Sequence, residues 1–540
     1  MTDADCPMKN PPAAPAVDLA SHSAPGTRRP ALRLLAALLL AALPPARAQE
    51  SAPPAVPPVG QSLGDGAGPA AGLSLDDAVK LALANNRSIK VDTYSKAIAR
   101  ANLLAAYGGF DPTINFNRSH SEAYSLSLQS VQNTIIPIST QVWQDDYSLT
   151  LNGTTPWGAV WSLGGTSTNQ RGSYNGFASN FLTTGGLTVT QPLLRGFGFA
   201  GSGATLGVRI AKANRAISDW AFRQTVIDTV TQVVVAYSNL LAAHENLRAA
   251  RRVRDGAAQL VSENEKRFKV GSVSENDVTS ARAQAALYDQ GVLQADEGVR
   301  EADNQLRQLL GEDRFGNDGP LLAVAAPPVP DLVADPAKDL QTAFELRPDY
   351  QQAKLGLSQD RYNESYARNQ LLPQVNFVGS YGYTGLDQSF AVSRQMVRDG
   401  DNRAYSAGVE VSIPLTFTQG RGKARAARLQ RQKDEAQLKL LEENIALGVA
   451  TAAGEMDTAR RSVAAAQNAE KLNESLVEAE LKRLRAGTGS TFAVLYQQQQ
   501  LSTADRQYAA ALANQWAAIA NYERTLGTTL QDYHITLTQP

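Results

Sequence analysis

The stretch RFKVGSVSENDV (residues 267–278) decides the fold, because it interrupts what otherwise reads as one very long helix. A second stretch, RLRAGTGSTFAV (residues 483–494), interrupts another long helical pattern, with Gly487 standing 216 positions after Gly271. Glycine permits the positive φ of a tight reversal. Ser274 followed by Asp277 matches a capping box that starts a returning helix. The two stretches therefore predict the tips of two long helical hairpins.

Other landmarks repeat in the same order as the tips. NRSI at 86–89 corresponds to RPDY at 347–350, DPTINF at 111–116 to LPQVNF at 372–377, and the proline of VTQPLL to that of VSIPLT. Matches in one order indicate an internal duplication. Each half is predicted to contain a helix, a strand pair and a long helical hairpin. The first repeat is expected at 73–319 and the second at 338–530, with a proline-rich connector at 320–337 and a C-terminal tail at 531–540.

The hairpin helices are predicted to be rods with a coiled-coil seam. Between Arg421 and Arg485, apolar residues recur every three or four positions: Leu438, Leu441, Ile445, Val449, Ala452, Met456, Ala459, Val463 and Ala466. A helix of about 64 residues is roughly 95 Å long. Many seam residues are alanine, which buries little surface, so we expect further helices to pack alongside.

The strand segments alternate with period two. In the segment at 404–413, Tyr405, Val409 and Val411 alternate with small or polar residues. Such segments suit the wall of a transmembrane β-barrel, although a half-buried soluble sheet shows the same alternation. A further pair, Tyr147–Asn152 and Ala159–Leu163, either joins the wall or forms an external loop.

Two incomplete structures in one chain favour assembly. Four strands cannot close into a barrel, and an open sheet leaves exposed edges. The rods also lack a complete core of their own. Both problems are solved if several chains assemble, with their strands forming one barrel and their helices a second tube.

The N-terminus predicts export. Three arginines precede the apolar run Leu34–Leu43, and an A-x-A pattern ends at Ala48, as in a secretory signal peptide. We expect a signal at 1–48 and a flexible lead-in at 49–72. The signal would carry away Cys6, the one cysteine, and leave a chain without disulfides. The formal charge of −1 gives no electrostatic reason to expect nucleic acid as a partner.

On the duplication, the tip motif RF-x-V-G-x-V-S-x-x-D-V, LLPQVNF and QPLLRGFG, the chain resembles the TolC-type outer-membrane efflux proteins from about residue 73 to 530. The resemblance implies a homotrimer in the outer membrane, with a twelve-stranded β-barrel in contact with lipid and a periplasmic α-helical barrel. It also implies two partners, a periplasmic adaptor (membrane fusion) protein and an inner-membrane transporter. The duct would serve efflux or type I secretion.

The same resemblance assigns roles to the tips. In the family the tips dock onto the adaptor, which here implicates Gly271, Ser272, Val273, Ser274, Gly487, Thr488, Gly489 and Ser490. Acidic side chains near both tips often narrow the periplasmic mouth in the family. Asp277 matches in the first half, whereas the second half has Ala493 and Tyr496 at the matching places. The resemblance thus implies an asymmetric constriction. Asp277 has a second reading as a helix-start carboxylate, and it could serve both roles.

Other functional classes find less support. A periplasmic coiled-coil adaptor or scaffold without a pore is the main alternative, but such proteins usually carry one hairpin and no aromatic strand pairs. For an enzyme, His120, His244 and His534 lie far apart without ligand spacing, and no nucleophile-elbow or zinc-protease motif occurs. The glycine-rich segment at 195–203 lacks the Lys-Ser/Thr of a phosphate loop. We expect no catalytic residue, no metal and no cofactor.

Overall fold

The computed structural model describes residues 73–131, 134–311, 321 and 334–537. The expected signal at 1–48 and lead-in at 49–72, most of the connector and the last three residues lie outside the described residues. The described residues belong to one unit, Ala67–Pro540. That unit contains helices and one antiparallel sheet.

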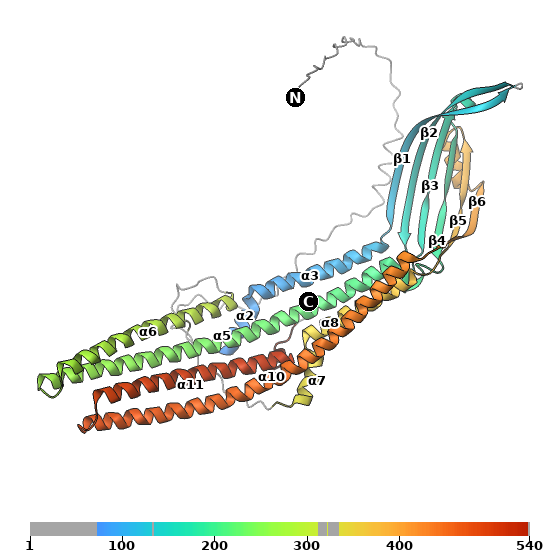
Figure 1. Ribbon diagram of the computed structural model, residues 1–540. Helices are drawn as coiled ribbons and strands as arrows, with labels where there is room; N and C mark the ends of the chain where they lie inside the picture. The colour runs from blue at the N-terminus through green and yellow to red at the C-terminus, as the bar shows by residue number, and fades with distance from the viewer. Residues whose placement is uncertain (1–72, 132–133, 312–320, 322–333, 538–540) are drawn as a thin grey trace, which may run out of the picture. The chain divides into compact units, whose positions relative to one another are not determined.

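The first half of the chain alternates helices and strands as follows (Figure 1): α2 (Leu75–Asn85), α3 (Arg87–Tyr107), η1 (Gly108–Phe110), β1 (Thr113–Val131), β2 (Thr134–Thr154), β3 (Val160–Gly172), η2 (Ser173–Asn175), β4 (Phe181–Pro192), α4 (Gly198–Gly201), α5 (Gly203–Lys269) and α6 (Glu275–Leu310).

The second half has a similar order with fewer strands: α7 (Pro336–Leu346), α8 (Pro348–Asn369), β5 (Gln374–Asp387), α9 (Phe390–Asp399), β6 (Arg403–Ser412), α10 (Thr418–Arg485), α11 (Thr491–Leu526) and α12 (Thr529–Asp532).

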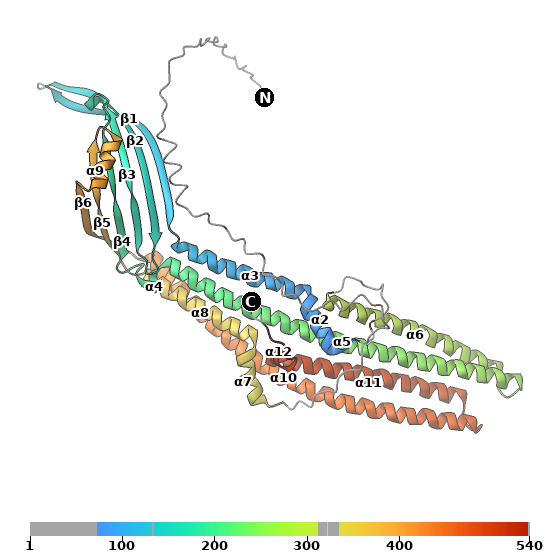
Figure 2. The ribbon, with the colours of Figure 1, turned by 180° about the vertical axis from the view of Figure 1, so that it is seen from behind.

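The two long hairpins, α5–α6 and α10–α11, pack side by side along α5 and α11. Their tips lie at the same end in both ribbon views (Figures 1 and 2). The predicted seam of α10 is confirmed, because Ile445, Val449, Ala452 and Met456 are buried and the other seam residues are half-buried. Lateral packing onto α11 completes a core around Ile519 and Tyr522.

The repeated landmarks occupy equivalent places in the two halves. Asn86 caps α3 and donates from Nδ2 to the carbonyl of Leu309 at the end of α6, at 2.8 Å. Arg347 precedes α8 and donates to the carbonyl of Thr525 at the end of α11, at 2.9 Å. In each half, the helix that leads into the strands is therefore tied to the end of its own hairpin.

The strands form one six-stranded sheet in the order β1-β2-β3-β4-β5-β6, every pair antiparallel. The expectation of one strand pair in each half is wrong for the first half, which has four strands. The segments Tyr147–Asn152 and Ala159–Leu163, whose placement the sequence left open, lie mostly in β2 and β3 and join the sheet. Hydrogen bonding between β2 and β3 along thirteen residue pairs is the physical reason.

One described helix, α5, is long and apolar enough by composition to cross a membrane. Of its most apolar window, 61% is buried inside the protein. Val230, Val233 and Leu240 of α5 lie within the main core beside Leu306 of α6 and Trp516 of α11. The apolar composition of α5 therefore reflects its position at the centre of the helical layer.

Candidate functional site

The first tip is a helix C-terminus closed by glycine. Gly271 has a φ of +76° and donates its N–H to the carbonyl of Phe268 at 2.9 Å. Ser272 donates to the carbonyl of Arg267, also at 2.9 Å. This pair of bonds is a Schellman motif, which satisfies the last carbonyls of a helix. A Cβ added to Gly271 would meet nothing within 4 Å, so the backbone angle alone requires glycine.

The second tip repeats this geometry at Gly487, whose φ is also +76°. Gly487 donates to the carbonyl of Leu484 at 3.2 Å, and Thr488 to that of Arg483 at 3.0 Å. Gly489 donates to the same carbonyl at 3.1 Å. The similarity predicted from two sequence stretches thus extends to the individual hydrogen bonds.

The returning helices begin differently. Ser274 accepts from the N–H of Asp277, and the Asp277 carboxylate accepts from the Ser274 N–H at 3.0 Å and its hydroxyl at 2.7 Å. The predicted capping box is therefore present. In the second tip Ser490 accepts from the N–H of Ala493 at 3.2 Å. Ala493 stands at the position of Asp277 and has no carboxylate to complete a capping box.

The hydrogen bonds from Ser274 hold the pKa of Asp277 below its usual range. The carboxylate is exposed in the single chain. The structure thus places Asp277 at the start of α6, where negative charge also faces the positive end of the helix dipole.

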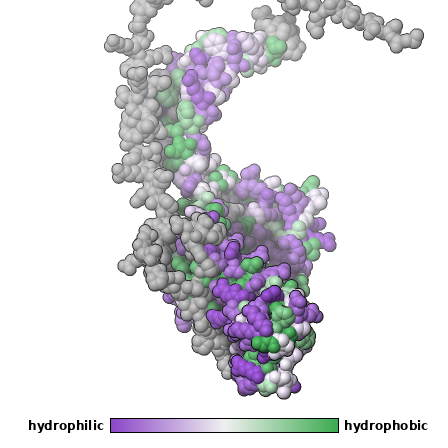
Figure 3. Space-filling model, turned by 90° about the vertical axis from the view of Figure 1, so that its left-hand side faces the viewer, coloured by the Kyte–Doolittle hydropathy of each residue, from purple (hydrophilic) through white to green (hydrophobic). Residues whose placement is uncertain are grey.

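The two tips share a small core and present a mixed outer surface. Leu260, Leu484 and Val494 are buried together beneath the turns. Outside them, Phe268 is 45% exposed and Phe492 is 76% exposed. The last turns of α5 and α10 carry basic residues, namely Lys266, Arg267, Lys269, Lys482, Arg483 and Arg485. Figure 3, viewed from the side of the tips, shows hydrophilic and hydrophobic residues intermixed there.

The sheet has two chemically distinct faces. One face, here called the polar face, carries small and hydroxylated residues on every strand, and several pair across strands. Thr166 and Thr184 hydroxyls lie 2.8 Å apart, and Ser380 and Ser406 hydroxyls also 2.8 Å apart. Such a face needs water or polar solutes beside it.

The opposite face carries a band of apolar residues near the helices. One directly paired residue from each of the six strands forms what we call the apolar row: Ile114, Leu151, Leu163, Leu187, Tyr381 and Tyr405. Five of the six are between 42% and 82% exposed in the single chain, and Leu151 is half-buried. An exposed apolar band that crosses a whole sheet indicates contact with a nonpolar environment.

Three directly paired glycines, Gly164, Gly186 and Gly382, lie on the polar face. A Cβ at any of them would lie between 2.2 and 2.5 Å from a carbonyl oxygen of an adjacent strand. Glycine at such close approaches permits a sharp local bend. The three glycines therefore let adjacent strands approach closely at this level of the sheet.

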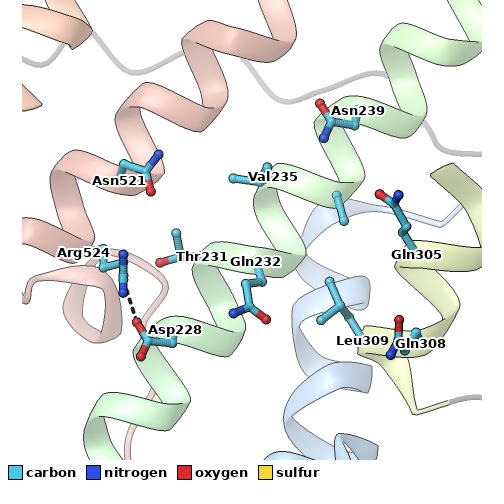
Figure 4. Close-up of a pocket in the computed structure, with 11 residues that line it drawn as sticks. Asp228, Thr231, Gln232, Val235, Asn239, Gln305, Gln308, Leu309, Asn521 and Arg524 are labelled. Carbon is cyan, nitrogen blue, oxygen red and sulfur yellow. Dashed lines mark hydrogen bonds and ion pairs between the residues drawn. The ribbon is translucent and has the colours of Figure 1, made fainter.

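A polar groove of about 450 Å³ lies where the two hairpins meet (Figure 4). Asp228 of α5 and Arg524 of α11 form an ion pair across it, with Nε and Oδ1 2.6 Å apart. Gln232, Asn239 and other amides from α5, α6 and α11 complete its lining. Among the described residues no group of three His, Cys, Asp or Glu is placed to hold a metal ion.

Sequence reasoning found the tips and the alternating strands but missed the full length of the first two strands. β1 and β2 extend beyond the end of β3 as a two-stranded ribbon, which protrudes in Figure 1. It also missed α9, which packs on β4 and β5 through a 2.9 Å hydroxyl contact between Ser393 and Thr183. The strict alternation in RSHSEAYSLSL (residues 118–128) was the available signal for the longer strand.

Solved structures with the same fold are outer-membrane channels. OprN aligns with a TM-score of 0.62 at 17% identity, covering 84% of this chain and 89% of its own. CmeC of Campylobacter jejuni aligns with a TM-score of 0.60 at 17% identity, covering 84% and 85%. MtrE of Neisseria gonorrhoeae, solved in an open state, gives 0.58 at 16% identity, with 84% and 88% covered. A comparison with curated proteins finds no match.

The sequence model of one family matches most of the chain. Residues 161–312 and 340–528 match the outer membrane efflux protein family, so that both hairpins and the last four strands fall within the match. The match covers parts of both halves of the duplication. Neither this match nor the fold shared with the channels above gives support to an adaptor without a pore. The chain belongs to the outer membrane efflux protein family.

Proposed function

We propose that three copies of this chain form an exit duct, with their sheets closed into one barrel in the outer membrane and their helices forming a periplasmic tube. The carrying observation is the six-stranded sheet with a polar face on one side and an exposed apolar row on the other. The polar face suits a water-filled lumen, and the apolar row suits lipid. Substrates would enter at the hairpin tips and leave through the barrel.

We propose further that the tips dock onto a periplasmic adaptor, which connects the duct to an inner-membrane transporter. The residues concerned are Gly271, Ser272, Val273, Ser274, Gly487, Thr488, Gly489 and Ser490. Their support is their position at one end of the hairpins, where all but the half-buried Val273 and Gly489 are exposed, with aromatic and basic side chains beside them. Rigid Schellman turns over a shared core would present that surface in one arrangement.

Asp277 is proposed to line the periplasmic mouth of the trimer in addition to starting α6. The exposed carboxylate next to the first tip supports this role. Because Ala493 has no charge, the mouth would carry one acid per copy from the first half and none from the matching place in the second.

Two adjacent residues of β4 test the orientation of the wall. Leu187 lies in the apolar row, Thr188 lies on the polar face, and both are exposed in the single chain. Leu187→Arg places a charge in lipid at a cost of about 2–4 kcal/mol near the bilayer midplane. Thr188→Arg places the same charge in the lumen.

We expect Leu187→Arg to reduce heat-modifiable trimer in the outer-membrane fraction, and Thr188→Arg to retain it. Light scattering of the detergent-solubilised parent should give about three protomer masses. Equal tolerance of both substitutions, or release of the parent by osmotic shock, contradicts the duct and favours the soluble adaptor alternative.

A further inference from the structure

The sheet of one copy ends in two free edges. β1 pairs only with β2, and β6 only with β5, among the described strands. β6 and the described side chains of β1 are exposed along their lengths. Because the strand directions alternate and the number of strands is even, β6 of one copy lies antiparallel to β1 of the next when they are placed together.

Resting on the proposed trimeric duct, we propose that every copy contributes all six strands, giving a barrel wall of eighteen strands in which β6 of one copy pairs with β1 of the next. The competing arrangement has twelve strands. There β1 and β2 hang outside the wall, and β3 pairs with the neighbouring β6, an equally antiparallel contact. Three observations favour eighteen.

The first observation is the continuity of the apolar row. Ile114 of β1 and Leu151 of β2 continue it in register, and Phe116 and Leu149 form a second apolar pair beside them. Ile114 and Phe116 are 61% and 70% exposed in the single chain. In a twelve-stranded barrel this surface would face water, whereas in the wider wall it joins the lipid-facing band.

The second observation is the anchoring of the β2–β3 turn at the root of the sheet. Thr155 donates to the carbonyl of Ala159 at 2.8 Å and closes the turn. The turn is then tied to the helical layer, because the Thr205 hydroxyl of α5 donates to the carbonyl of Pro156 at 2.6 Å. Gly198 also donates to the carbonyl of Trp157 at 3.0 Å. β2 thus ends, and β3 begins, at the end of the sheet nearest the helices, as the other strands do.

The third observation is the helical layer below. α3 packs on α5, α5 on α8 and α8 on α10, so α3 and α10 border the layer. α3 leads into β1, and α10 follows β6. Both bordering helices expose apolar stripes: Val91, Tyr94 and Ile98 on α3, and Leu429, Leu440 and Leu447 on α10. When α3 of one copy packs against α10 of the next, both stripes are covered. This packing also brings β1 of the first copy beside β6 of the second, so the contact between copies continues from helices to strands.

Eighteen strands in place of twelve would make the lumen about 1.5 times as wide, which suits bulkier solutes.

Paired cysteines decide between the two walls. In a Cys6→Ser background, which removes the chain's one cysteine, Asn115→Cys on β1 is combined in turn with each of four polar-face positions on β6: Ser406→Cys, Gly408→Cys, Glu410→Cys and Ser412→Cys. The matched set replaces Asn115→Cys by Ser162→Cys on β3. Each variant is oxidised in outer membranes and run on denaturing gels, and trimer assembly is checked beforehand by heat-modifiable migration.

With eighteen strands, at least one β1–β6 pair forms covalent dimers and trimers, and every β3–β6 pair stays monomeric because β2 and β4 flank β3. Cross-linking of β3 to β6, or no β1–β6 cross-link in variants that assemble as trimers, overturns the proposal and leaves the duct intact. Absence of trimer in the Cys6→Ser parent instead contradicts the proposed function itself.

Discussion

Replacing Gly271 by alanine isolates the energetic cost of the tip's backbone angle. An added methyl group meets nothing within 4 Å, so no steric clash contributes. The φ of +76° remains, and an L-residue in this region costs about 1–2 kcal/mol. Gly291 in α6 also has open space around it, but its φ is not positive. Gly291→Ala should therefore stabilise the same hairpin by about 1 kcal/mol.

Hydrogen exchange measured by mass spectrometry on the purified full-length protein reads this difference locally. The relevant peptide spans residues 267–278, whose Gly271 and Ser272 amides close the turn. A loss of about 1 kcal/mol corresponds to about fivefold faster exchange. Gly271→Asn should remain close to the parent, because asparagine adopts the left-handed region more readily.

The reasoning fails if Gly271→Ala exchanges no faster than the parent, or if Gly291→Ala accelerates exchange equally. The first result would mean that the turn relaxes to another conformation without cost. The second would mean that any change in the hairpin loosens it. The same comparison at Gly487, with Gly454 of α10 as the control in open space, should give the same signs.

Three further predictions concern charge and width. In planar bilayers Asp277→Asn should reduce cation selectivity and block by multivalent cations, and Ala493→Asp should strengthen both; no change in either variant would leave Asp277 as a helix cap only. Burial raises the pKa of Glu523 to about 8, so the folded state retains a proton that the unfolded state releases, and stability falls as pH rises from about 4.5 to about 8. Glu523→Gln should abolish that fall, on the order of 5 kcal/mol, and an unchanged difference in melting temperature between pH 5 and pH 9 would refute it. In the eighteen-stranded wall, a Ser380→Cys variant, with the cysteine on the polar face, should react from outside the cell with larger polymer-linked maleimides than a lumen-facing cysteine at the same height in a twelve-stranded relative; the same size limit in both would refute the wider lumen.

Local signals made the hairpins predictable. The Gly-Ser and Gly-Thr turns, the capping serines and the heptad-like seam each act within a few residues, and all are present as expected. By contrast, the fate of Tyr147–Asn152 depended on its pairing partners, and alternation alone cannot identify a neighbouring strand. The helix α9 depended likewise on its contact with the sheet at Thr183.

The role of Asp277 depends on more than one chain. Its contacts with Ser274 follow from the sequence spacing and are observed. Whether it faces a pore depends on how copies are arranged in the proposed trimer, which no pattern within one chain specifies. For this reason the cap was derivable from local residues, while the constriction stays a prediction.

The pairing of β4 with β5 determines when the sheet can be completed during synthesis and export of this chain. The ladder runs from the Pro192–Asn376 pair to the Phe181–Asp387 pair, so it cannot form until the whole first hairpin and the start of the second half have been synthesised and exported. The first hairpin, by contrast, closes through neighbours in sequence and can fold early. During that interval β4 has an unsatisfied edge of twelve residues, which invites pairing with other nascent chains. We therefore expect periplasmic holding chaperones to be needed most while the second half is still emerging.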